Sequence, residues 1–214
     1  MTQTITTPVT HKFNSFEVLR DSALPLGTKA TITLANNDVI EFDLVHKHAY
    51  GATNIFVIAD CYGEHYMSRM FTNKGGYNES DMRRHLREDI LPLIPDDLKK
   101  LIIPRTIIQN VNGEIVKPKN GPDLIWLPSI TEVDAKHPSS VDVDDVHFDF
   151  FDTEKSRVKE LDPHGTWPWS LRSATASNTA RFEGVDSEGV DSFGYAPGSY
   201  SANYTKGVCF GFCI

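Results

Sequence analysis

The feature that most constrains the fold is a pair of short apolar runs joined by a turn. Residues 28–34 alternate apolar and polar side chains, as a half-buried strand does. Turn residues occupy 36–38, and residues 39–45 are typical of a hairpin partner. The continuously apolar run 55–59 adds a strand buried on both faces. The chain is therefore predicted to begin its fold with an antiparallel sheet, whose first strand buries Ala30, Ile32 and Leu34.

The stretch 78–90 predicts an amphipathic helix. It follows the pair Gly75-Gly76 and ends before Pro92, and its apolar residues recur at a spacing of four. A second short helix is predicted over 96–101, after an acidic pair suited to a first turn. The predicted core face of the first helix comprises Met82, Leu86 and Ile90, and its predicted solvated face comprises Arg83, Arg84, Arg87 and Glu88.

Two later apolar runs, 124–127 and 207–214, are predicted to be buried strands. Between them the tract 174–206 has the composition of a long irregular loop. With no internal repeat, the chain is predicted to be one α+β domain with two short helices and a mixed or antiparallel sheet. This domain spans 13–214 and follows a polar, Thr-rich N-terminal arm, 1–12.

Composition excludes several classes of function. A net charge of -8 disfavours nucleic acid, because phosphate binding needs clustered Lys and Arg. No apolar run approaches the roughly eighteen residues of a membrane span. Residues 1–12 lack the basic start and apolar stretch of a secretory signal, so we expect synthesis and folding in a cytoplasm. Three cysteines are too few for a disulfide framework, so free thiols are expected.

Five stretches, taken in order, resemble one family. They are GGYNESDMR at 75–83, LIPDDLK at 93–99, LIWLPSITEV at 124–133, WSLRS at 169–173 and GVCFGFCI at 207–214. This pattern resembles the domain of unknown function 6273 family of bacterial surface proteins and bacteriophage genomes, over about residues 28–214. The resemblance implies a C-type-lectin-like fold, similar also to sulfatase-modifying factors, with paired terminal strands and a variable loop surface. The sequence departs from the family where Val208-Cys209 replaces an Arg-Pro pair.

Catalysis is the minor hypothesis. Cys209 and Cys213 lie four apart on a predicted strand, which puts both on one face and suggests a redox pair like that of formylglycine-generating enzymes. Yet apolar residues separate them, and no basic residue follows to lower a thiol pKa. No Gly-x-Ser-x-Gly elbow and no phosphate-binding glycine loop is present. We therefore predict packed thiols, no cofactor and no enzymatic activity.

Two further groups have structural interpretations. The acidic, aromatic stretch 141–152 could ligate calcium, but it lacks the glycine of a tight cation loop. A solvated acidic face is the preferred interpretation, and no metal site is predicted. Arg172 lies among apolar neighbours on a predicted strand, which favours a buried hydrogen-bonded pair.

The best functional candidate is the tract 174–206, which is rich in Ser, Asn, Gly and Tyr. Tyrosines offer rigid contact area while small polar residues adapt, as in an antibody paratope. An alternative is that the tract packs on neighbouring subunits. The predicted ligand-binding residues are Asn178, Arg181, Tyr195, Tyr200, Asn203 and Tyr204.

The resemblance leads us to expect a non-enzymatic structural or adhesion protein of a bacteriophage-type particle. It would be made in the host cytoplasm and would present a lectin-like surface to a host glycan or protein, with other particle proteins as partners and with possible homo-oligomerisation. One alternative is a cytoplasmic or surface interaction module of a bacterium that binds a protein. A formylglycine-generating-like oxidoreductase is the remaining alternative.

Overall fold

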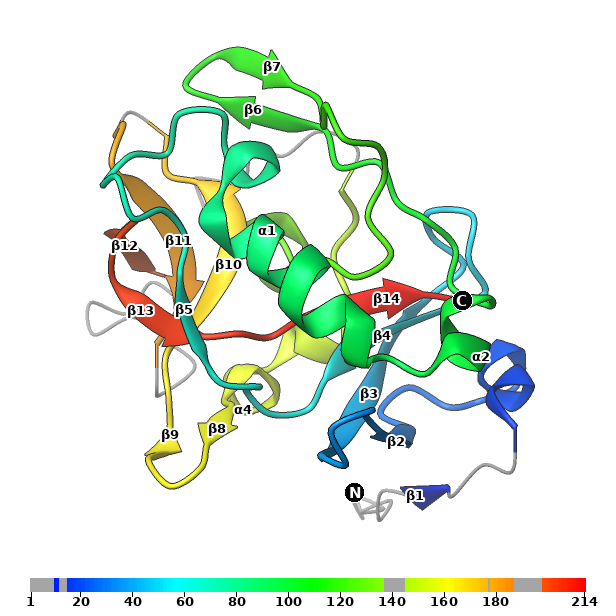
Figure 1. The fold of residues 1–214 in the computed structure, drawn as a ribbon. Helices are drawn as coiled ribbons and strands as arrows, with labels where there is room; N and C mark the ends of the chain where they lie inside the picture. Colours follow the sequence, from blue (N-terminus) through cyan, green and yellow to red (C-terminus); the bar gives the residue numbers. More distant parts are fainter. Residues whose placement is uncertain (1–9, 12–14, 137–144, 177, 187–197) are drawn as a thin grey trace, which may run out of the picture.

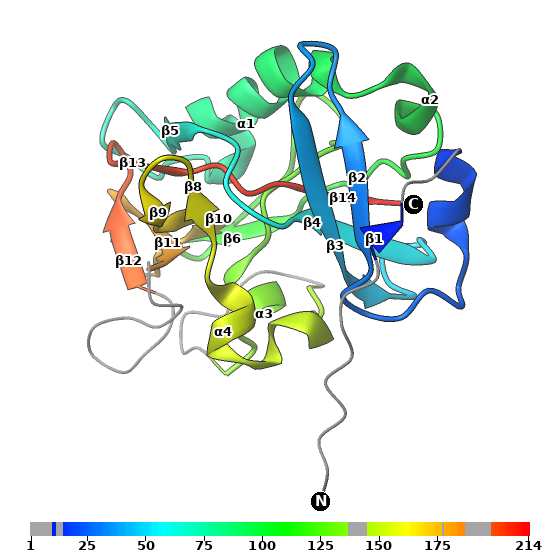
Figure 2. The same cartoon turned by 90° about the horizontal axis from the view of Figure 1, so that it is seen from below.

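The computed structural model describes residues 10–11, 15–136, 145–176, 178–186 and 198–214. Two five-stranded sheets lie side by side (Figures 1 and 2). Across the first sheet the strands are β1 (Thr10–His11), β2 (Lys29–Thr33), β3 (Val39–Lys47), β4 (Asn54–Ile58) and β14 (Gly211–Cys213). Across the second they are β12 (Gly198–Ser201), β11 (Arg181–Val185), β10 (Trp169–Ala174), β13 (Thr205–Gly207) and β5 (Glu64–Tyr66). Two small hairpins pair β6 (Gln109–Val111) with β7 (Glu114–Val116), and β8 (Glu160–Leu161) with β9 (Gly165–Thr166).

The predicted first hairpin is confirmed. β2 and β3 are antiparallel, with Ile32 opposite Ile40, and β4 pairs with β3 on its other side. The alternating residues of β2 face the core, and every residue of β4 is buried. Both sheets are mixed, because β1 runs parallel to β2 and β10 runs parallel to β13. The described residues therefore form an α+β fold.

The helices are short. α1 (Asp81–His85) continues as a π-helical turn (Leu86–Ile90), and the Ser80 hydroxyl caps it by accepting from the Arg83 N–H at 3.0 Å. Its predicted core residues are buried. The second predicted helix is α2 (Asp96–Lys99), and α3 (Ile130–Val133) and α4 (Glu154–Arg157) are two further helices that the sequence did not predict. 3-10 turns cover Phe16–Arg20, Tyr77–Glu79, Leu91–Leu93 and Asp149–Asp152.

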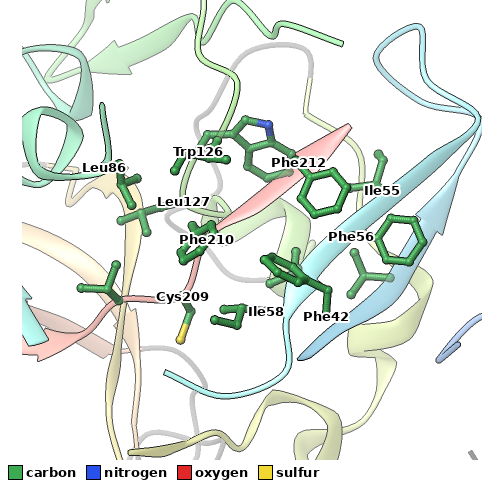
Figure 3. Close-up of a cluster of buried hydrophobic side chains, with 14 of the residues drawn as sticks. Phe42, Ile55, Phe56, Ile58, Leu86, Trp126, Leu127, Cys209, Phe210 and Phe212 are labelled. Atoms are coloured by element: carbon green, nitrogen blue, oxygen red, sulfur yellow. The ribbon is translucent and has the colours of Figure 1, made fainter. Parts of the chain in front are cut away.

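An aromatic cluster at the junction of the sheets forms the centre of the core (Figure 3). The rings of Phe42 and Phe212 meet edge to face at 5.1 Å between centroids, and Phe56 stacks on Phe212 at 5.5 Å. Trp126 closes the cluster and is fully buried. Each such side chain stabilises the fold by about 2–3 kcal/mol through removal from water. The C-terminal strand β14 thus anchors both the first sheet and the core.

Three expectations need correction. Residues 124–127 are largely buried but form no strand, because their contact with β14 is a single bridge, Trp126 to Gly211. The tract 174–206 is not irregular throughout, since β11, β12 and part of β13 come from it. Arg83 does not face solvent: its Nε lies 2.9 Å from Asp123, whose side chain is fully buried. Burial raises the pKa of Asp123 and the Arg83 charge opposes this rise.

Most of the predicted N-terminal arm lies outside the described residues, so the division into arm and domain stays a prediction. Its described part, Thr10–His11, extends the edge of the first sheet. Within the described residues, no helix has the length and apolar character needed to cross a membrane.

Candidate binding surface

The described members of the predicted binding set gather at one end of the second sheet. β11 and β12 are antiparallel, with Arg181 opposite Ser201. The Ala202 N–H donates to the Ala180 carbonyl at 2.8 Å, which brings the turn before β11 beside the loop after β12. Asn178, Arg181, Asn203 and Tyr204 lie on these two segments, and Tyr200 lies on β12. Tyr195 lies outside the described residues.

Local hydrogen bonds orient the polar side chains of this group. Arg181 Nη1 donates to the Ser199 carbonyl at 3.2 Å, and the Ser201 hydroxyl donates to Asn203 Oδ1 at 2.6 Å. Asn178 Oδ1 accepts from the backbone N–H two residues later, at 2.9 Å, and so closes its own turn. Arg181 and Asn203 are exposed. Their donors and acceptors are therefore presented to solvent in fixed positions.

A third segment, residues 68–73, completes this surface and was not predicted from the sequence. The Asn73 N–H donates to the Thr179 carbonyl at 2.8 Å, and Asn73 Nδ2 donates to the Arg181 carbonyl at 2.9 Å. The Ser68 N–H donates to the Ala202 carbonyl at 2.8 Å. We call residues 68–73, 178–181 and 201–204 together the end surface. Its three backbone segments brace one another.

Large apolar side chains of the end surface are open to solvent. Met70 is 80% exposed, Phe71 56% and Tyr204 68%. Phe71 also has a φ of 52°, a left-handed conformation that costs a residue with a large side chain about 1–2 kcal/mol. Strained residues of this kind cluster at functional sites, so the exposed Phe71 on a braced turn points to a function rather than to stability.

Tyr200 is less available than the other members. Lys206 Nζ lies 2.6 Å from the centroid of the Tyr200 ring and covers one of its faces. Burial lowers the pKa of Lys206 to about 7, and Asp186 opposes this effect. The Tyr200 ring is therefore partly covered and less open to a ligand than the exposed Tyr204 ring.

A buried ring of alternating charges lies in the interior. Glu132 accepts from Arg105 and Arg172 at 2.6 Å each, and Asp145 accepts from the same two guanidinium groups at 2.6 and 2.5 Å. The Tyr50 hydroxyl donates to Glu132 at 2.8 Å. The four charged side chains of the ring are at most 7% exposed, and they come from four separate chain segments. The prediction that Arg172 makes a buried pair is confirmed.

The charges of the ring suit a structural role. Burial alone would raise the pKa of Glu132, but the charges of Arg105 and Arg172 lower it to about 2, so Glu132 is a poor base. Asp145 is an exception to the predicted solvated acidic face, since its side chain is only 4% exposed, whereas the side chains of Asp149 and Asp152 are 60% and 69% exposed as predicted. Asp142 and Asp144 lie outside the described residues. A cavity of about 210 Å³ adjoins the ring and is lined by Tyr50, Arg105, Asp145 and residues 104–108.

The two C-terminal cysteines have different neighbours. Cys209 Sγ lies 3.2 Å from Cys61 Sγ, whereas Cys213 lies close to Trp126 and Arg105. Burial raises the pKa of Cys213 to about 12 and that of Cys209 well above its usual value. Raised pKa values are the reverse of what a thiol needs to make the first attack on a substrate.

These features define an α+β domain of two mixed sheets that displays a braced polar and apolar surface at one end. The family model described as "Domain of unknown function (DUF6273)" matches residues 51–208, so the chain belongs to that family. No curated protein and no solved structure matches the chain.

Proposed function

We propose that the chain is a non-enzymatic recognition domain of a bacteriophage-type particle, and that its end surface binds a protein on the host surface. The observation that carries the proposal is the exposure of Met70, Phe71 and Tyr204 on segments fixed by backbone hydrogen bonds. A C-type-lectin-like fold is part of the proposal. It is supported by the display of turns at one end of the second sheet, whereas the expected pairing of terminal strands is absent among the described strands, because β14 pairs with β4 and not with β1 or β2.

The chemistry of the end surface favours a protein partner. Aromatic residues, Met and Arg are enriched in the buried centres of protein interfaces, and this surface offers all three types. Its braced backbone lowers the ordering cost of binding. A host glycan is the second candidate, because the exposed Tyr204 ring adjoins Asn203, whose side chain can hydrogen-bond hydroxyl groups.

A cell-binding assay with the labelled full chain tests the proposal. We expect the double variant Met70→Ser, Phe71→Ser to bind host cells at least about tenfold more weakly than the wild type, because interface centres carry most of the affinity. Val39→Ser is the matched control, since Val39 is 63% exposed on the first sheet, away from the end surface. Equal binding by the double variant and the wild type would contradict the assignment.

Treatment of the cells separates the candidate ligands. Protease treatment of the cells should abolish binding if the ligand is a protein, whereas periodate oxidation should abolish it if the ligand is a glycan. Co-purification of the chain with phage particles tests its proposed location in the virion. Chains found only in uninfected bacteria would favour a bacterial interaction module instead.

A further inference from the structure

Two segments cross between the sheets side by side. Residues 59–63 lead from β4 to β5, and residues 208–210 lead from β13 back to β14. The Tyr62 N–H donates to the Val208 carbonyl at 2.9 Å, and the Val208 N–H donates to the Gly63 carbonyl at 3.1 Å. The sheets are therefore joined by a hydrogen-bonded pair of crossovers.

Each crossover carries one cysteine. Cys61 Sγ and Cys209 Sγ are 3.2 Å apart, and Figure 3 shows the Cys209 sulfur at the edge of the apolar cluster. A side chain on Gly207 would overlap Cys61 Sγ, so the sulfur occupies space that only a glycine leaves. The Cys61 N–H donates to the Glu160 carbonyl at 2.8 Å, and Lys159 Nζ donates to two carbonyls at the end of β4. Both sulfurs are thus held next to each other by fixed backbone.

We propose that Cys61 and Cys209 form a thiol oxidation site, at which a low-molecular-weight disulfide such as glutathione disulfide converts the pair into an intramolecular disulfide. A disulfide bond is about 2.05 Å long, so the sulfurs need to approach by roughly 1 Å. The bond would fasten the two sheets together at their crossovers.

The exchange proceeds in two displacements. The Cys61 thiolate attacks one sulfur of glutathione disulfide, which forms a mixed disulfide and releases one glutathione thiolate. Cys209, after giving its proton to solvent, attacks the Cys61 sulfur and releases the second glutathione. The protein loses two protons and two electrons, and the electrons reduce one glutathione disulfide to two glutathione molecules.

The environments of the thiols set this order. Cys61 is partly exposed, whereas Cys209 is fully buried. Burial and the contact with Cys61 raise the pKa of Cys209, so the accessible thiol reacts first and the buried one resolves the mixed disulfide. Cys213 is buried among other residues and provides an internal control.

The test exposes the native full chain to glutathione disulfide, alkylates it in denaturant and maps the cysteines by mass spectrometry. We expect a loss of two hydrogens, a Cys61–Cys209 linked peptide and alkylation at Cys213 alone. Cys213→Ser should oxidise as the wild type does, whereas Cys61→Ser should not form the disulfide. The urea midpoint should rise on oxidation and return on reduction with dithiothreitol, because the bond closes a loop between residues 148 positions apart.

Several outcomes would overturn the proposal. They are a glutathione adduct that persists on Cys61, a linked peptide that contains Cys213, and three alkylated cysteines after exposure of the native chain. Because Cys61 is only partly buried, its serine variant is expected to fold, which circular dichroism checks. Disulfide formation in that variant would equally refute the assignment.

Discussion

Glu132→Gln tests the buried charge ring most directly. The substitution keeps the shape of the side chain but removes one negative charge, so Arg105 and Arg172 are left with Asp145 alone. Breaking a buried pair by removing one partner costs about 3–5 kcal/mol, because an uncompensated charge stays out of water. The depression of the Glu132 pKa from 4.5 to about 2 corresponds independently to roughly 3 kcal/mol.

Urea unfolding monitored by tryptophan fluorescence provides the measurement. With a denaturant dependence of about 2–3 kcal/mol per molar, the midpoint of Glu132→Gln should fall by roughly 1–2 M. Glu114→Gln is the matched control, because Glu114 is exposed on β7 and its substitution should change stability by less than about 0.5 kcal/mol.

The pH dependence provides a second check. The folded pKa of Glu132 is depressed, so its contribution is fully present above the unfolded value near 4.5 and is lost as the pH falls toward 2. The gap in stability between wild type and Glu132→Gln should therefore narrow between pH 5 and about pH 2. A loss below about 1 kcal/mol at neutral pH, or a gap independent of pH, would refute the reasoning.

Three further predictions concern other parts of the molecule. Lys206→Met should raise the free energy of unfolding at pH 7 by roughly 1–3 kcal/mol, because the buried ammonium is unfavourable. In a denaturation series this gain should shrink as the pH rises from about 7 toward 10.5, and a gain that stays constant would contradict the prediction. Gly207→Ala should destabilise the fold by about 1–3 kcal/mol through overlap with Cys61 Sγ; Cys61→Ala should restore much of this loss in the double variant, and additive losses would exclude the clash. Phe71→Gly should leave thermal stability unchanged or raise it by up to about 1 kcal/mol, since glycine relieves the strain of the positive φ. The same variant should bind more weakly at the end surface, and a large loss of stability would show that the Phe71 ring serves packing.

Local patterns predicted the elements that depend on local sequence. The alternation of β2, the apolar run of β4 and the four-residue spacing of α1 each encode burial within a few residues, and all three elements form as predicted. Arg83 and Asp145 were wrongly placed in solvent because their partners are distant in the sequence. Asp123 and Arg105 pair with them only after the chain has folded, and nothing in the local composition distinguishes a paired charge from a solvated one.

Only part of the end surface was predicted from the sequence. Ser, Asn, Gly and Tyr residues drew attention to the tract 174–206, but the same composition hid β11 and β12, because Gly and Asn are weak strand formers. The turn 68–73 escaped prediction entirely. Its role depends on the exposure of Met70 and Phe71 and on hydrogen bonds to two distant segments, and a single sequence records neither.

The completion of the first sheet by β14 has a consequence for synthesis. β4 is buried along its whole length, yet one of its edges pairs with β14, whose Phe212 lies opposite Phe56. Until the ribosome has made residues 211–213, that apolar edge has no native partner. Nascent chains therefore carry an open strand edge from the synthesis of β4 until that of β14, the kind of template on which other chains aggregate. Slow elongation should lower the soluble yield of this protein, and a chaperone that shields strand edges should restore it.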